Sequence, residues 1–144
     1  MMSTSYNELL DSIKTTIDRK NSAKRFMLAF IAALKADLVR LADAPEDACR
    51  TGTMAGRLSF ERDRYDFHGG SVVFGIELRF PVESRYVTFP VPVALREQDG
   101  VLVVNVKGRS VVVVGHAQGL SDEDVRVVAL SVLDEIRKEV AQRP

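Results

Sequence analysis

The residues of this chain that could carry out catalysis or hold a metal are few and lie far apart. Its 144 residues include two histidines, His68 and His116, and one cysteine, Cys49. Zinc sites are built from several Cys, His or carboxylate ligands at short spacings, and neither histidine has a partner at such a spacing. A cysteine nucleophile needs a base beside it, and no triad spacing surrounds Cys49. The sequence therefore predicts no catalytic residue, no metal site and no cofactor, and favours a protein that is not an enzyme.

Residues 114–119 lead from a predicted strand to a predicted helix, which is where phosphate-binding loops lie. The segment lacks the Gly-Lys-Ser/Thr ending of such loops. Three acidic residues, Asp122, Glu123 and Asp124, stand at the start of the helix and would repel an anion. We interpret the segment as an ordinary connection.

Four consecutive charged residues, 61–64, occupy strand positions between apolar residues typical of a core. Charged side chains are seldom buried without partners. One extra residue in the strand, a β-bulge, would turn these charges outward to pair with a neighbouring strand. Without the bulge, Arg62 and Arg64 line the core face and form, with Tyr65, a polar pocket for an anionic small molecule. The sequence leaves both arrangements open.

The composition is that of an ordinary globular domain. Hydrophobic residues make up 46%, charged residues 28%, and the formal net charge is zero, so the basic excess that drives nucleic-acid binding is lacking. The longest apolar run, residues 26–34, is far shorter than the roughly 20 residues that span a bilayer. A lone cysteine requires no oxidising compartment. We expect a cytoplasmic protein that binds neither nucleic acid nor a membrane.

Residues 101–114 predict a β-hairpin, because the segment is dominated by valine and Gly108 supplies a tight turn. The expected pairing separates two apolar faces: Leu102, Val104, Val106, Val111 and Val113 on one, and Val101, Val103, Val112 and Val114 on the other. Both faces then need cover, whereas an antiparallel sheet commonly leaves one face in water. We expect one helix on the first face, and the amino-terminal helix or another subunit on the second.

A long helix is predicted for residues 4–42. Its apolar residues alternate three and four apart, as in a coiled-coil seam; they are Tyr6, Leu10, Ile13, Ile17, Met27, Ile31, Leu34, Leu38 and Leu41. Lys20 and Lys24 fill two positions of this seam, so the seam must open there, their stems must carry the ammonium groups to water, or acids on a neighbouring helix must meet them. Residues 26–41 are therefore expected to pack on the sheet while residues 6–17 reach away. Whether the helix is continuous through Asn21 and Ser22 stays open.

The remaining segments complete a single α+β domain, residues 1–144. Pro45 ends the first helix, and residues 43–56 are expected to form a linker. A five-stranded antiparallel meander follows in residues 57–115, and a second helix in residues 121–141 has an apolar stripe for the sheet. Pro90 and Pro92 lie in the third strand. Since proline cannot donate to a ladder, one side of that strand must be open there, or the strand must bend.

Surplus apolar surface on the long helix and the hairpin leads to a functional hypothesis. The chain is expected to be a non-catalytic, homo-oligomeric module, most simply a dimer, that binds a small-molecule or protein partner. The expected interface comprises Leu10, Ile13, Ile17, Val103, Val112 and Val114. The alternative is a small-molecule-binding protein or small enzyme, with Arg62, Arg64 and Tyr65 in a pocket between sheet and helices.

Deletion of residues 1–20 tests this division of the long helix. The truncated chain is expected to fold and to associate more weakly, because the deleted part serves another subunit and not the chain's own core. Circular dichroism and light scattering measure the two properties. A truncated chain that cannot fold as a monomer would contradict the division.

Overall fold

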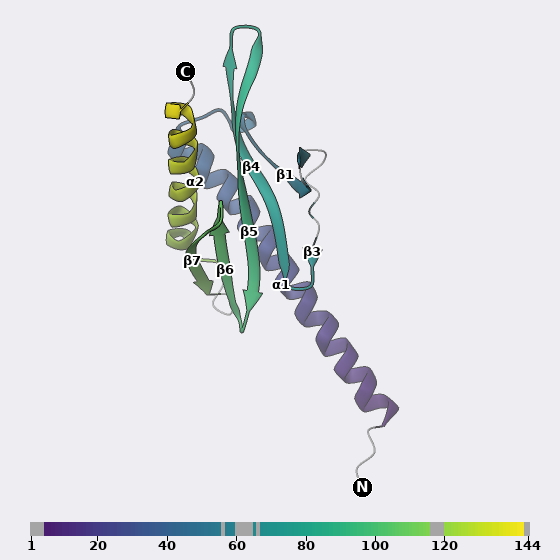
Figure 1. The fold of residues 1–144 in the computed structure, drawn as a ribbon. Helices are drawn as coiled ribbons and strands as arrows, with labels where there is room; N and C mark the ends of the chain where they lie inside the picture. The colour runs from purple at the N-terminus through teal and green to yellow at the C-terminus, as the bar shows by residue number, and fades with distance from the viewer. Residues whose placement is uncertain (1–4, 56, 60–64, 66, 116–119, 143–144) are drawn as a thin grey trace.

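The computed structural model describes residues 5–55, 57–59, 65, 67–115 and 120–142, with backbone alone at residues 54, 55, 57–59 and 110–115. A long helix, α1 (Tyr6–Ala42), precedes the sheet, and a second, α2 (Asp122–Gln142), follows it. The strands are β1 (Cys49–Ala55), β2 (Arg57–Ser59), β3 (Phe67–His68), β4 (Ser71–Val82), β5 (Arg85–Gln98), β6 (Val101–Val106) and β7 (Arg109–Gly115). This confirms the predicted α+β arrangement (Figure 1).

The described strands form one antiparallel sheet in the order β2-β1-β4-β5-β6-β7, with β3 also paired to β4. Five of them, β1 and β4 to β7, are long, and β4 to β7 form a meander. The first long strand differs from expectation, because β1 lies within the segment expected to be a linker. The sequence did not predict this strand, because its glycine and polar residues lack an apolar alternation. In the structure Cys49 and Thr51 are buried, and Arg50 between them faces the opposite side of the sheet.

The two prolines of β5 lie just outside the described ladder between β5 and β6. Pro90 and Pro92 pair with β4 opposite Glu77 and Gly75, whereas β6 pairs with β5 only from Val93 onward. The missing N–H groups therefore cost no hydrogen bond to β6. Among the described residues, no strand pairs with this side of β5 at the two prolines, as expected, and the Pro92 carbonyl there accepts from the Lys107 N–H at 2.9 Å.

The register of the β6–β7 hairpin differs from the expected one. Val106 pairs with Arg109 and Asn105 with Ser110, but a bulge follows, so that Val104 pairs with Val112 and Leu102 with Val114. The extra residue on β7 shifts its phase by one position. The backbone thus places Val112 and Val114 opposite two buried residues of β6, and not in register with Val103.

Both helices pack on one face of the sheet and against each other (Figure 1). The buried side chains of β4 to β6 on that face alternate along each strand, as the pleat requires: Val72, Phe74, Ile76 and Leu78 in β4, Phe89, Val91, Val93 and Leu95 in β5, and Leu102, Val104 and Val106 in β6. From α2, Val125, Val128, Val132 and Ile136 meet them. The core is therefore a single layer between the sheet and two helices.

Helix α1 is continuous through Asn21 and Ser22 and is capped at both ends. The Ser5 hydroxyl accepts from the Glu8 N–H while the Glu8 carboxylate accepts from the Ser5 N–H, which makes a capping box. Asp43 ends the helix in the left-handed conformation, with φ of 49°. A helix of 37 residues is about 55 Å long, so it exceeds the domain that it serves.

The two halves of α1 have different surroundings, as predicted. The core includes Met27, Phe30, Ile31, Leu34 and Leu38 from the second half. Residues 6–22, here called the overhang, project past the sheet (Figure 1), and all of their side chains are exposed except Leu10, which is partly so.

The two seam lysines mark the transition between the halves. Lys20 is exposed, and the Lys24 ammonium lies 5.2 Å from the centre of the Phe67 ring. Both stems carry their charge to the surface, as expected for lysine beside an apolar seam.

A pair of alanine variants tests the boundary between core and overhang. Leu34→Ala is expected to lower the free energy of unfolding by about 2–5 kcal/mol, because it leaves a cavity in the core. Ile13→Ala, at a side chain 55% exposed, is expected to change it by less than about 0.5 kcal/mol. Urea unfolding at low protein concentration, where association contributes least, measures both. Equal losses would place Ile13 in the chain's own core.

Candidate functional site

A groove of about 770 Å³ runs between α1 and β1. Its size falls in the range of roughly 300–1,000 Å³ that is typical of ligand sites. One wall comes from α1, with Leu28, Ile31, Ala32, Lys35, Ala36 and Val39; the other comes from Ala44, Glu46, Thr51 and Tyr65. The groove is largely apolar, with a few polar groups that could orient an occupant.

Two hydroxyl groups meet in the wall of the groove. The Thr51 Oγ1 and Tyr65 Oη atoms are 2.6 Å apart, and the edge of the Tyr65 ring packs on Phe74, with centroids 6.1 Å apart. Tyr65 therefore lines the groove between α1 and the sheet, and its predicted role in ligand binding stays a prediction. Arg62 and Arg64, its predicted companions, lie outside the described residues.

Among the described residues that line the groove, Lys35 carries the positive charge. It is half-buried, and the ion pairs found among the described residues do not include it. Neither Lys35 nor Thr51 was predicted from the sequence. Lys35 follows the helical pattern of an ordinary surface lysine, and Thr51 lies in a segment expected to be a linker.

Cys49 is buried at the start of β1. Burial raises the pKa of its thiol from 9.0 to about 12; the Lys35 ammonium opposes this shift and the Glu77 carboxylate adds to it. The thiolate is the reactive form of cysteine, so this thiol is inert at neutral pH. Within the described part of the chain, no three His, Cys, Asp or Glu residues are grouped as metal ligands would be.

The other face of the sheet carries an ion pair in which Glu77 is buried and the Arg50 side chain is 42% exposed. Arg50 on β1 donates from Nε to the Glu77 Oε1 on β4 at 2.9 Å, and the Glu77 side chain is only 3% exposed. Removing one member of such a pair leaves an uncompensated buried charge, which usually destabilises a fold. This pair joins β1 to the meander and is structural.

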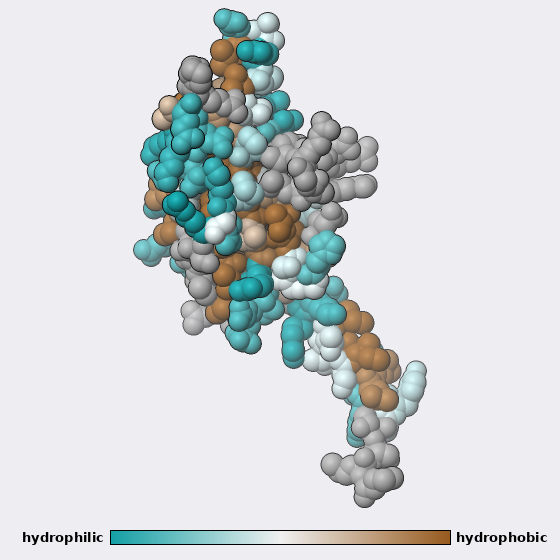
Figure 2. Space-filling view, viewed as in Figure 1, coloured by the Kyte–Doolittle hydropathy of each residue, from teal (hydrophilic) through white to brown (hydrophobic). Residues whose placement is uncertain are grey.

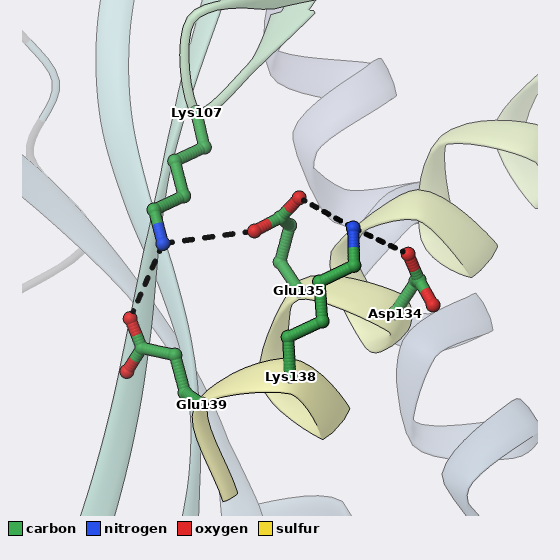
Figure 3. A network of polar contacts seen from close by, with 5 residues as sticks. All are labelled: Lys107, Asp134, Glu135, Lys138 and Glu139. Atoms are coloured by element: carbon green, nitrogen blue, oxygen red, sulfur yellow. Dashed lines mark hydrogen bonds and ion pairs between the residues drawn. The ribbon is translucent and has the colours of Figure 1, made fainter. Parts of the chain in front are cut away.

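A surface network joins the β6–β7 turn to α2 (Figure 3). Lys107 lies 3.6 Å from Glu135 and 3.5 Å from Glu139, and Lys138 lies 3.2 Å from Asp134 and 3.7 Å from Glu135. Exposed ion pairs contribute about 0–1 kcal/mol each. The network therefore positions the turn and offers no concave site.

The overhang is the second candidate surface. Figure 2 shows apolar side chains gathered along one side of it. Of the predicted interface residues, Ile13 and Ile17 are 55% and 50% exposed there, and Leu10 is partly exposed. Val103 is half-buried in β6, and the side chains of Val112 and Val114 lie outside those described. The structure thus gathers three of the six residues on one helical face.

Comparison of the chain with protein-family models, with curated proteins and with solved structures finds no match. Among the described residues, no helix combines the length and apolar character needed to cross a membrane.

The raised pKa of Cys49 predicts alkaline destabilisation. Between about pH 9 and 12 the unfolded chain loses the thiol proton while the folded chain keeps it, so the free energy of unfolding falls as pH rises. Cys49→Ala removes this contribution. Urea unfolding of both proteins from pH 8 to 11 is expected to show a steeper loss for the parent chain, and parallel curves would contradict the buried, protonated thiol.

Proposed function

We propose that this protein is a cytoplasmic, non-catalytic module that works as a homo-oligomer, most simply a dimer, and associates through the α1 overhang. One observation carries the proposal. Tyr6, Leu9, Ile13 and Ile17 are 78%, 52%, 55% and 50% exposed on a helix that extends past its own sheet.

The overhang cannot bury these side chains on its own domain, because α1 is one continuous helix. Full burial of a Leu or Ile side chain contributes about 1.5–3 kcal/mol. Contiguous exposed apolar surface of this kind usually marks a protein–protein interface. A second copy is the simplest partner, since closed symmetric homo-oligomers are the commonest assemblies.

The groove supports a second candidate function, binding of a small molecule. Tyr65, Thr51 and Lys35 place hydroxyl groups and a cation beside apolar walls, and Glu46 adds a carboxylate; apolar walls with a few polar groups are typical of small-molecule sites. Such binding needs no second copy, so its strength would not depend on protein concentration. The candidate function is binding, and no reaction is proposed for the groove.

Light scattering coupled to gel filtration tests the first proposal. The parent chain is expected to elute as a dimer at micromolar concentration. The double variant Ile13→Asp, Ile17→Asp is expected to elute as a folded monomer, because each carboxylate would be buried unpaired in the interface.

The matched control is Leu130→Asp, at a side chain 47% exposed on α2, which is expected to leave the dimer unchanged. Circular dichroism verifies that each variant is folded. A monomeric parent chain, or an aspartate pair in the overhang that leaves the dimer intact, would overturn the proposal.

A further inference from the structure

A stripe of large apolar side chains follows α1 from the overhang into the groove. It consists of Tyr6, Ile17, Leu28 and Val39, each eleven residues after the last. Eleven residues make three turns at about 3.67 residues per turn, so these positions lie almost in line along the helix. The first two belong to the overhang and the last two line the groove, so one stripe connects both candidate surfaces.

The two ends of this eleven-residue stripe have complementary shapes. Within the stripe, the overhang end carries the bulky Leu10, while the groove end carries Lys35, flanked by the exposed alanines Ala32 and Ala36. Bulky side chains on one helix pack well where small ones on the other let the helices approach. An antiparallel second helix would bring these unlike ends together.

We propose that a second copy of this chain packs its α1 antiparallel along the stripe, so that each copy's overhang fills the other's groove. The inference rests on the proposed homo-oligomer and names its geometry. A twofold axis near residues 22 and 23 brings Ile17 opposite Leu28 of the second copy, and Tyr6 opposite Val39 of the second copy. The groove is then completed by the partner.

Polar residues occupy the middle of α1, where this axis passes. Asp18, Asn21, Lys24 and Arg25 border, with Leu28, a hollow of about 410 Å³. In the antiparallel register Asn21 faces Lys24 of the second copy, and Asp18 comes beside Arg25 of the second copy, each twice. A polar residue within an apolar seam fixes register and orientation. The same register also brings Lys20 beside Lys24 of the second copy, whereas a parallel pair would place every charged residue beside its own copy.

The length of the contact also favours this arrangement. From Tyr6 to Val39 the shared stripe extends about 50 Å at 1.5 Å per residue. This is about three times the length from Tyr6 to Ile17 that the overhang alone would offer. Specific interfaces bury roughly 1,200–2,000 Å² in total. Two equivalent overhang-in-groove contacts approach that size more readily than a single pairing of two short overhangs.

Engineered disulfides test the register. In the double variant Ile17→Cys, Leu28→Cys, the two positions of one chain are about 16 Å apart along the helix, too far for an internal bridge. Oxidised glutathione is expected to convert most of this variant to a covalent dimer on a non-reducing gel. Each single variant alone is expected to stay mostly uncrosslinked, and an equal mixture of the two is expected to form a crosslinked heterodimer.

A second pair, Leu10→Cys with Lys35→Cys, provides an independent measurement of the same register. The native Cys49 is buried and serves as an unreactive background. Leu130→Cys, exposed on α2, is the control for random collision and is expected to stay uncrosslinked.

The outcomes separate the register from the oligomer. A dimer by light scattering in which single variants crosslink to themselves, or in which neither double variant crosslinks, overturns the antiparallel register and leaves the proposed function intact. A different protein or a small molecule as the occupant would leave the purified chain monomeric and uncrosslinked, which overturns both proposals.

Discussion

The rest of this structure depends on which side chains of β4 face the two helices. Strand β4 pairs along its whole length with β5, from Ser71 opposite Arg96 to Val82 opposite Arg85. That register puts Phe74 and Ile76 on the same face as Val91 and Val93, and a slip of one residue would turn all of them to the opposite face. Both helices must cover this face, so the second half of α1 is committed to the core and its first half is left without sheet beneath it.

The ion pair between Arg50 and the buried Glu77 joins β1 to β4, together with the ladder between these strands. Strand β1 carries Thr51 of the groove wall, so the groove is assembled from elements remote in sequence. The groove therefore depends on core packing and not on a local motif. The polar groups of its described wall are two hydroxyl groups, one ammonium group and the Glu46 carboxylate.

The sequence predicts the elements whose signals are local and misses those that depend on distant partners. The heptad pattern with Lys20 and Lys24 locates the division of α1, and Pro90 and Pro92 indicate the unpaired side of β5. The bulge in β7 has no residue signature, since Val111 is a valine like its neighbours. The predicted pairing of that strand beyond the bulge was therefore wrong. Likewise Lys35, Thr51 and Tyr65 lie on three separate elements, and only the tertiary structure brings them together.

The capping box at Ser5 bears on how fast and how tightly the overhang can associate. A short isolated helix is marginal in water because its first turn is costly to form, but here the packed half of α1 supplies that nucleus and Ser5 with Glu8 closes the far end. The overhang is thus helical before it contacts a partner. Association therefore does not carry the entropic cost of folding a disordered segment. Binding by such a preformed helix is a collision between rigid surfaces, in which changes at the contact alter mainly the lifetime of the complex and only slightly its rate of formation.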